Sequence, residues 1–327
     1  MKKYNVVQQI LADKKTDGMQ CETGEAFAPT NIALCKYWGK RDSELNLPVT
    51  SSLSIALPEK GAYTTLSLHD RAEDLVILNG IELTEDSSFV KRVSEYLDLF
   101  RQPKQWALKI AIKMNIPVAA GVASSACGFA SLISALDDLF KWQLDKRELS
   151  ILARLGSGSA SRSLWNGFVE WHAGVRADGM DSYAEPLSYE WPGLRVGIVA
   201  ITKEQKPISS RAAMQHTVDT SLLYESWPKK VDADMQSLKY ALQEKDFALL
   251  GCTAESNALA MHATMLSATP PVCYFLPETI SAMQCVWALR RSGVEVYFTE
   301  DAGANIKLLF MSEDEEQVKQ AFAELEL

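Results

Sequence analysis

A run of tiny side chains at residues 116–130 is the strongest local feature of the sequence whose residue types could do chemistry. This run, I-P-V-A-A-G-V-A-S-S-A-C-G-F-A, leads directly into a helical pattern. Small side chains let a backbone close around a ligand, and the first N–H groups of a helix attract phosphate because they have no partner within the helix. The run therefore predicts either a phosphate-binding loop or a helix that packs tightly through small residues.

The spacing within this run excludes two common kinds of phosphate-binding loop. Gly121 and Gly128 form a G-x6-G pattern that no Lys-Ser or Lys-Thr pair follows, so the run is not a Walker A motif. The H-R-D and D-F-G motifs of protein kinases are also missing from the sequence.

A second small-residue stretch, G-S-G-S-A-S-R-S at residues 156–163, contains an arginine and precedes a possible helical turn. The planar guanidinium of Arg162 could hold a carboxylate or a phosphate through two parallel hydrogen bonds. The alternative is an ordinary turn whose arginine is surrounded by water.

Two lysines and one aspartate are further candidates. Lys36 and Lys40 share one face of a helix because they are four positions apart, and one face of a strand because that separation is even. Both ammonium groups could therefore converge on one polyanion, unless they are ordinary surface lysines. Asp301 follows a strand pattern and begins a turn of small residues, where it is either a buried base or a turn-forming aspartate.

The elements that must position these residues change in kind along the chain. Strand patterns dominate the first half and helical patterns the second, so an α+β protein with two lobes is predicted. We expect an irregular or weakly helical extension at 1–25, an N-terminal lobe at 26–190 and a C-terminal lobe at 191–327. Strands are predicted at 52–57, 63–68, 74–78, 106–112, 168–171, 194–201, 294–298 and 306–310. Helices are predicted at 87–99, 128–140, 146–155, 224–244, 246–265, 278–292 and 313–325.

Composition and charge exclude several classes of protein. The chain has 327 residues and a formal net charge of −9, which argues against nucleic acid as the main partner. No secretory signal is recognised, and the longest clean apolar run, at 196–201, is too short to cross a bilayer. The six cysteines lack C-x-x-C spacing and the four histidines lack an H-E-x-x-H motif, so we expect reduced cysteines and no zinc site. The resulting expectation is a cytoplasmic protein.

Taken in order, these motifs resemble the diphosphomevalonate decarboxylase family of the GHMP small-molecule kinase superfamily, from about Ala28 to Phe310. The matching segments are 31–41, 47–48, 51–54, 121–128, 156–163, 209–215 and 301–303. The departures from the family pattern are Val122 (for Leu), Ser161 (for Cys), Ala213 (for Gly) and Ala304 (for Pro). None of them removes a charged group, and the extension before Ala26 lies outside the resemblance.

The resemblance implies a fold, a reaction and its participants. The fold would be the two-lobed GHMP kinase arrangement, with an N-terminal α/β lobe, a C-terminal lobe like a ferredoxin-like sandwich, and the active site in the cleft. Mevalonate 5-diphosphate and ATP, with Mg²⁺, would give isopentenyl diphosphate, ADP, phosphate and carbon dioxide. The protein would bind neither nucleic acid nor membranes and, like many relatives, would be a homodimer. The alternatives are an enzyme that acts on mevalonate or its monophosphate, as a kinase only or as a monophosphate decarboxylase, and a non-catalytic metabolite sensor.

Residue roles carry over from the family motifs position by position. Asp301 would serve the C3 hydroxyl as its base or its orienting acceptor, Lys36 would neutralise charge on the transferring phosphoryl group, and Arg162 would hold the C1 carboxylate. Substrate binding would also involve Asn31, Tyr37, Trp38, Gly39, Lys40, Ser157, Gly158, Ser159, Ala160, Ser161, Ser210 and Arg211. The phosphates of ATP would be bound by Gly121, Val122, Ala123, Ser124 and Ser125, with Ser125 also near Mg²⁺.

Overall fold

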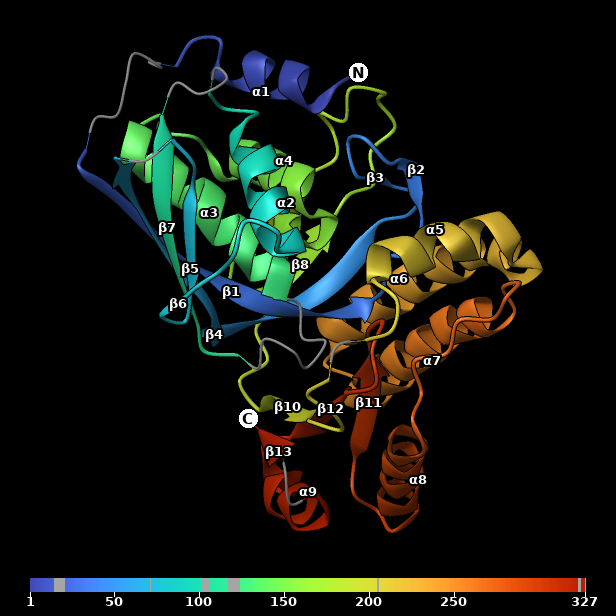
Figure 1. Ribbon diagram of the computed structural model, residues 1–327. Coiled ribbons are helices and arrows are strands. Elements are labelled where there is room, and N and C mark those ends of the chain that lie inside the picture. Colours follow the sequence, from blue (N-terminus) through green and yellow to red (C-terminus); the bar gives the residue numbers. More distant parts are fainter. Residues whose placement is uncertain are drawn as a thin grey trace.

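Two large β-sheets and the helices that pack on them form the protein (Figure 1). The computed structural model describes residues 1–14, 21–70, 72–101, 106–116, 124–204, 206–322 and 325–326. Within these ranges, helices and strands are mixed as the α+β prediction requires. No helix in the described part of the chain has both the length and the apolar character needed to span a bilayer.

The first sheet has seven strands within the described residues. Its strand order is β6-β5-β7-β4-β8-β9, with β1 paired to β4 outside this path. The strands are β1 (Thr23–Cys35), β4 (Ser52–His69), β5 (Leu75–Leu78), β6 (Ile81–Glu82), β7 (Ala107–Met114), β8 (Gly167–Trp171) and β9 (Ala184–Pro186). A short ribbon of β2 (Lys40–Asp42) and β3 (Leu47–Pro48) lies apart from it.

Strand β4 is one long strand where the sequence patterns predict two, at 52–57 and 63–68. Its partner β1 pairs Thr30 with Leu57 and the preceding Pro29 with Gly61, so residues 58–60 bulge out of the ladder without ending the strand. The turn-forming residues in this stretch therefore mark a bulge. Because β4 also pairs with β7 and β8, it connects most of the sheet.

Helices α2 (Ser88–Leu97), α3 (Ser124–Phe140) and α4 (Lys146–Gly156) share one apolar core with the first sheet (Figure 1). Helix α3 lies on β1 and β4, and α4 contacts α1 (Lys3–Leu11). The segment 1–25, expected to be irregular or weakly helical, thus contains a regular helix. It is stabilised because Val6, Val7, Ile10 and Leu11 are buried in the same core.

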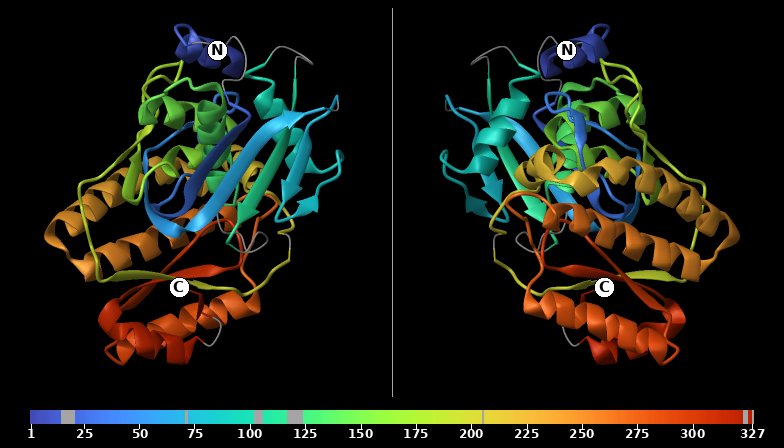
Figure 2. Two further views of the ribbon diagram at one scale, coloured as in Figure 1. Left: turned by 90° about the vertical axis from the view of Figure 1, so that its left-hand side faces the viewer. Right: turned by 90° about the vertical axis from the view of Figure 1, so that its right-hand side faces the viewer.

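The second sheet is antiparallel, with strand order β11-β12-β10-β13. Phe298 and Leu308 belong to a core shared with α8 and α9, whereas Tyr297 and Leu309 belong to a core shared with α6 and α7. Figure 2 shows helices on both sides of this sheet. The strands are β10 (Leu194–Val199), β11 (Val296–Glu300), β12 (Ile306–Met311) and β13 (Leu325–Glu326). The helices are α6 (Trp227–Glu244), α7 (Phe247–Leu266), α8 (Pro277–Arg291) and α9 (Glu315–Ala321).

Two elements of the second half differ from the sequence prediction. The helix predicted at 313–325 begins after a 3-10 turn and ends at Ala321, and the chain then forms β13 beside β10. Backbone pairing at that free sheet edge replaces the last helical turn. Helix α5 (Ser210–Thr220) was not predicted, because its buried face is narrow, with Ala213, Met214 and Thr217. The Ser209 hydroxyl caps it by accepting a hydrogen bond from the Ala212 N–H.

The end of β1 lies between the two sheets. Leu34 and Cys35 belong to the core that contains α6 and α7. The Thr299 hydroxyl on β11 donates to the Ala33 carbonyl at 3.2 Å, and the Lys36 N–H donates to Oδ1 of Asn257 on α7 at 2.8 Å. These contacts bring the ends of β1 and β11 together, which places Lys36 beside Asp301.

Candidate active site

Asp301 is held between two buried lysines. Its Oδ1 lies 2.9 Å from Nζ of Lys36, and its Oδ2 lies 3.2 Å from Nζ of Lys307. The side chains of Lys36 and Lys307 are 2% and 1% exposed, whereas that of Asp301 is 25% exposed. Burial opposes ionisation, but the two ammonium groups outweigh it and hold the pKa of Asp301 well below its usual range. The site therefore presents an ionised carboxylate with one accessible edge.

Backbone contacts fix this ion-pair cluster. Lys36 also donates from Nζ to the Ala33 carbonyl at 2.8 Å, and Lys307 donates to the Asn305 carbonyl at 3.2 Å. The carbonyl of Asp301 lies 3.1 Å from Nε2 of the buried His262, which anchors the turn after β11. Burial lowers the pKa of Lys36, and Lys307 adds to this effect. Asp301 therefore supplies the negative charge that balances these two buried lysines.

Arg162 ends the 3-10 helix η1 (Gly158–Arg162) and is buried, so the interpretation as a solvated turn arginine is wrong. Its Nε donates to Oδ1 of Asn31 on β1 at 3.2 Å, and Nη1 donates to the Ser52 hydroxyl on β4 at 2.6 Å. Burial lowers the pKa of Arg162 to about 10, although the charge of Asp301 partly offsets this. Within the described part of the chain, its remaining nitrogen Nη2 donates to no acceptor. A free N–H group on this buried arginine, which also interacts electrostatically with Asp301, suits an anionic ligand.

The two small-residue stretches meet. The Ser125 hydroxyl in the first turn of α3 lies 3.3 Å from the Ser157 hydroxyl, which lies 3.3 Å from that of Ser159. Asn31 joins the same group, since its amide nitrogen lies 3.3 Å from the Ser159 carbonyl and 2.8 Å from the Ser163 hydroxyl. Ala160 and Ser161, which follow Ser159 in the same segment, are buried. The predicted phosphate-binding residues Gly121, Val122 and Ala123, and the side chain of Ser124, lie outside the described residues.

Tyr37, Trp38 and Gly39 form a close-packed segment. A Cβ on Gly158 would lie 2.8 Å from the Tyr37 ring, so glycine is needed there for close approach. Within the described residues, the buried Tyr37 hydroxyl has no hydrogen-bond partner. Gly39 has a φ of +112°, and a Cβ there would collide with the hydroxyl of Tyr224, which donates to the Trp38 carbonyl at 3.1 Å. Tyr37 can therefore offer a hydroxyl to a ligand, whereas Trp38 and Gly39 shape the backbone.

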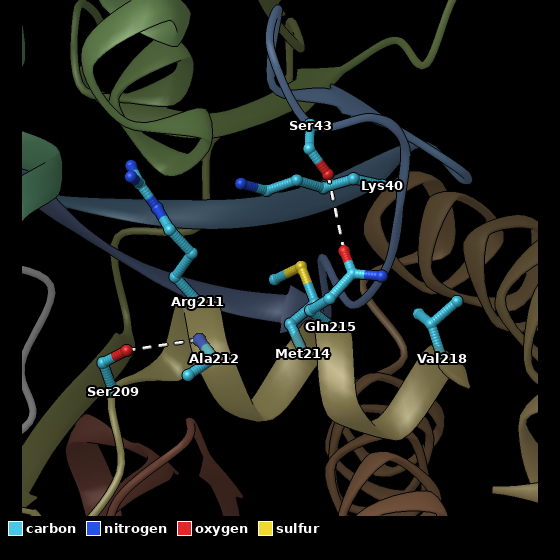
Figure 3. A pocket seen from close by; sticks show the side chains of 8 residues that line it. All are labelled: Lys40, Ser43, Ser209, Arg211, Ala212, Met214, Gln215 and Val218. Carbon is cyan, nitrogen blue, oxygen red and sulfur yellow. Dashed lines mark hydrogen bonds between the residues drawn. The ribbon is translucent and has the colours of Figure 1, made fainter. Parts of the chain in front are cut away.

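Lys40 and Lys36 point to separate partners. Lys40 donates from Nζ to Oδ1 of Asn46 at 2.7 Å, while Lys36 contacts Asp301. The argument from their even separation fails because residues 36–39 form neither helix nor strand and turn at Gly39. Lys40 instead lines a pocket of about 420 Å³ with Ser43, Ser209, Arg211, Ala212, Met214, Gln215 and Val218. In Figure 3 the charged ends of Lys40 and Arg211 extend to the same side of this pocket.

The chain is similar to known proteins in both sequence and structure. A family model described as a diphosphomevalonate decarboxylase-like N-terminal domain matches residues 28–184, and one described as a mevalonate 5-diphosphate decarboxylase C-terminal domain matches 196–325. The chain belongs to the diphosphomevalonate decarboxylase family. A diphosphomevalonate decarboxylase of Aspergillus fumigatus is 39% identical over 315 residues, covering 89% of this chain and 77% of the relative. The enzyme of Saccharomyces cerevisiae is 35% identical over 319 residues, covering 92% and 81%.

Solved structures of this family share the fold. The mevalonate diphosphate decarboxylase of Staphylococcus aureus superimposes with a TM-score of 0.87 at 38% identity, covering 92% of each chain. A structure described as MDDEF in complex with MVAPP, AMPPCP and magnesium gives a TM-score of 0.85 at 39% identity, covering 94% of this chain and 96% of that one. The predicted family and its two-lobed α+β fold are confirmed.

Three cations of this diphosphomevalonate decarboxylase family member were missed by the sequence analysis. Lys307 is a lone lysine in an apolar strand, a signal that could have drawn attention to it. Lys206 bridges the Ser210 hydroxyl at 2.5 Å and the Ala302 carbonyl at 2.9 Å, and so links α5 to the turn of Asp301. Arg92 on α2 donates to the Gly156 carbonyl at 3.5 Å, and its sequence context gives no hint of this position.

The cluster also contains a buried carboxyl, Glu300, directly before Asp301. Its side chain is 1% exposed, and within the described residues neither carboxylate oxygen has a hydrogen-bond partner. Burial raises the pKa of Glu300 to about 9, although Lys307 and Lys36 lower it in part. Its Oε2 lies 3.8 Å from Nε2 of His262, whose pKa burial lowers to about 3. Both groups are therefore neutral near pH 7.

We expect Glu300→Gln to stabilise the protein at neutral and alkaline pH. The folded-state pKa of Glu300 lies above its usual value of 4.5, so the stability it contributes is present below that value and is lost as the pH rises toward about 9. A glutamine carries no titratable proton and avoids this loss. As the pH rises from about 4.5 to 7, the unfolding free energy of the variant should increase by about 3 kcal/mol relative to that of the unchanged protein.

Urea unfolding at several pH values checks this expectation. Glu316→Gln, at an exposed glutamate on α9, is the control and should show no such pH-dependent gain. A stability difference for Glu300→Gln that stays the same at all pH values would contradict the assignment.

Proposed function

We propose that this protein uses ATP to decarboxylate mevalonate 5-diphosphate, which yields isopentenyl diphosphate, ADP, phosphate and carbon dioxide. The observation that carries the proposal is the ionised Asp301 between Lys36 and Lys307, with the buried Arg162 nearby. Membership of the family supports the reaction. A solved structure of the mevalonate diphosphate decarboxylase from Enterococcus faecalis superimposes on this chain with a TM-score of 0.84. Its description names a mevalonate diphosphate mediated ATP binding mechanism, which supports both substrates.

Asp301 serves the C3 hydroxyl in the first step. A tertiary alcohol is a weak nucleophile, so its oxygen must be aimed at the γ-phosphorus of ATP. The exposed edge of Asp301 accepts a hydrogen bond from this hydroxyl. Because two lysines stabilise the carboxylate, it takes the proton only as the new O–P bond forms and the bond to ADP breaks. Lys36 and Lys307 offset the charge that develops on the transferred group.

Arg162 serves the second step. Phosphate leaves from C3 with the electron pair of the C3–O bond, and the C1–C2 bond breaks at the same time. The pair from C1–C2 becomes the new double bond between C2 and C3, and C1 departs as carbon dioxide. Arg162 holds the C1 carboxylate through its free Nη2 group, so that the breaking C1–C2 bond stays anti to the leaving phosphate.

Two neighbouring regions receive the phosphate groups. The substrate 5-diphosphate is bound by Tyr37, Lys40, Ser157, Ser159, Ser210 and Arg211, and the phosphates of ATP by residues 121–125. Support comes from the hydrogen-bonded hydroxyls of Ser125 and Ser157, which join the two regions. The remaining residues of the predicted site, among them Asn31 and Ala160, hold these phosphate-binding residues in position.

Magnesium fits this arrangement as a partner of ATP. No group of three metal-ligating His, Cys, Asp or Glu side chains occurs among the described residues. Mg²⁺ commonly binds through substrate phosphates and waters with few protein ligands, and the Ser125 hydroxyl at the start of α3 suits such a role. When bound, the ion neutralises part of the phosphate charge. The complex of a relative with magnesium supports this assignment.

Product analysis by mass spectrometry tests the proposed function. With ATP and mevalonate 5-diphosphate, carbon dioxide, ADP and phosphate should form in equal amounts, and mevalonate or its monophosphate should react far more slowly. ADP without carbon dioxide would mean a kinase. Binding by calorimetry without turnover would mean a metabolite sensor.

Besides the roles of the site residues, three parts of the sequence prediction remain predictions. These are the lobe boundary near residue 190, the cytoplasmic location and the homodimer. Limited proteolysis would locate the lobe boundary, and cell fractionation would show where the protein lies in the cell. Light scattering would show whether it is a homodimer.

A further inference from the structure

Two polar side chains from neighbouring helices meet in the core of the second half of the chain. Asn257 on α7 is 0% exposed, and Asp234 on α6 is 6% exposed. The other residues that α6 buries are hydrophobic. A polar group in such surroundings lowers stability unless its hydrogen bonds are made. The partners of this pair therefore decide what it does.

Hydrogen bonds connect the pair to Lys36. Nδ2 of Asn257 donates to Oδ2 of Asp234 at 2.7 Å, and Oδ1 of Asn257 accepts from the Lys36 N–H at 2.8 Å. At the other end, Nζ of Lys230 on α6 lies 2.6 Å from each carboxylate oxygen of Asp234. Nδ2 of Asn257 also lies 3.5 Å from Sγ of Cys35. A continuous series of hydrogen bonds thus runs from Lys230 to the backbone of Lys36.

Asp234 decides which way the amide of Asn257 faces. Its carboxylate is paired with Lys230 and only accepts hydrogen bonds, so it must face the NH2 group of the amide. The amide oxygen is thereby turned toward the backbone N–H of Lys36, which only donates. A reversed amide would place two oxygens together at one end and two N–H groups together at the other.

The backbone of Lys36 needs such an anchor. Lys36 is the first residue after β1, and residues 36–39 form neither helix nor strand. Strand pairing therefore does not fix this residue, although its Nζ is held 2.8 Å from the Ala33 carbonyl and 2.9 Å from Oδ1 of Asp301. The bond to Asn257 fixes the backbone from which this side chain extends.

We propose that Asn257, oriented by Asp234, is a positioning residue that holds the Lys36 ammonium in place for phosphoryl transfer. This inference rests on the proposed function, which assigns Lys36 to the charge on the transferring group. The effect of Asn257 passes through Lys36. A displacement of about 1 Å in a catalytic constellation can slow a reaction about a hundredfold.

Asn257→Ala is the first test. Its kcat for carbon dioxide release should fall about a hundredfold, whereas KM for mevalonate 5-diphosphate should change by less than about threefold. In single turnovers, ADP and carbon dioxide should appear equally late, because Lys36 acts in the first step. The Lys36 ammonium signal in a ¹⁵N NMR spectrum, identified by its loss in Lys36→Gln, should shift in Asn257→Ala.

Exchange of the two buried residues provides the rescue. In the double variant Asp234→Asn/Asn257→Asp, the new carboxylate at 257 still accepts from the Lys36 N–H. The new amide at 234 donates to that carboxylate and accepts from Lys230. Asp234→Asn alone leaves the Asn257 amide without a fixed orientation and should lower kcat about tenfold or more. The double variant should restore kcat to within about threefold of the unchanged protein, together with the Lys36 signal.

Leu250→Ala is the control for a purely structural effect, because Leu250 is buried on the same helix and in the same core. It should lower the urea concentration at which half the protein unfolds. It should neither move the Lys36 signal nor reduce kcat per folded molecule.

A combination with Lys36→Gln decides whether Asn257 acts through Lys36. In that background, Asn257→Ala should cause no further loss of kcat, because residues that act as one unit are not additive. A further hundredfold loss would overturn the inference, as would an exchanged double variant that folds normally but stays slow. Failure of the proposed function appears differently, as absence of carbon dioxide release by the unchanged protein. The Lys36 signal in Asn257→Ala and in the double variant would still decide the role of Asn257.

Discussion

Asp301→Asn is expected to lower kcat by about a thousandfold or more while KM for mevalonate 5-diphosphate stays nearly unchanged. Asparagine preserves the size of the side chain and can still approach the C3 hydroxyl. It cannot take the proton as the O–P bond forms, and it does not balance the two ammonium groups that now contact Asp301 at 2.9 and 3.2 Å. The loss therefore falls on the phosphoryl-transfer step and leaves the binding of the distant diphosphate intact.

The same substitution should also reduce stability. Removal of one partner from a buried ion pair commonly costs about 3 kcal/mol, because the remaining charge stays buried without compensation. Lys36 and Lys307 are both almost fully buried, so one of them should release its proton in the variant. Thermal unfolding measured beside the kinetics separates this effect from the catalytic one.

Asp232→Asn is the control for Asp301→Asn, since Asp232 is exposed on α6. It should change neither kcat nor stability. Asp301→Glu keeps the charge but moves the carboxylate, and should fold well yet turn over slowly. If Asp301→Asn kept most of its turnover, Asp301 would be neither the acceptor nor the base for the C3 hydroxyl.

The pairing of Asp301 with Lys36 could not be predicted from local patterns, because 265 positions separate the two residues. The resemblance to a family placed both in one site. Lys307 escaped notice for a related reason. A lysine in a strand usually faces water, and Lys307 is buried only because β12 lies between β11 and β10 and is covered by α7. Strand order, which no local pattern contains, decides its role.

Local patterns failed where the backbone departs from regular structure. The argument that Lys36 and Lys40 share a face assumed a helix or a strand, and the left-handed turn at Gly39 removes that assumption. By contrast, the helix at Lys3–Leu11 could have been predicted from the sequence, because Val6, Val7, Ile10 and Leu11 have helical spacing. Its place in the fold could not be predicted, since this depends on packing against α4.

Arg162→Gln is expected to reduce carbon dioxide release by about a hundredfold or more, while KM for ATP changes by less than about threefold. The guanidinium is fixed by Asn31 and Ser52, and the negative charge of Asp301 acts on it. Glutamine retains some hydrogen bonding but loses the positive charge that orients the C1 carboxylate. Parallel measurement of carbon dioxide and ADP in single turnovers shows which step has slowed.

Arg154→Gln provides a control that is matched in burial. Arg154 is also fully buried, but its guanidinium donates to the backbone carbonyls of Leu45, Gly179 and Ser182, so its role is structural. Its substitution should lower the unfolding free energy without changing the ratio of carbon dioxide to ADP. Arg162→Lys restores a charge without the planar fork and should recover only part of the activity. If KM for ATP rose in Arg162→Gln as much as carbon dioxide release fell, Arg162 would bind the phosphates of ATP instead of the substrate carboxylate.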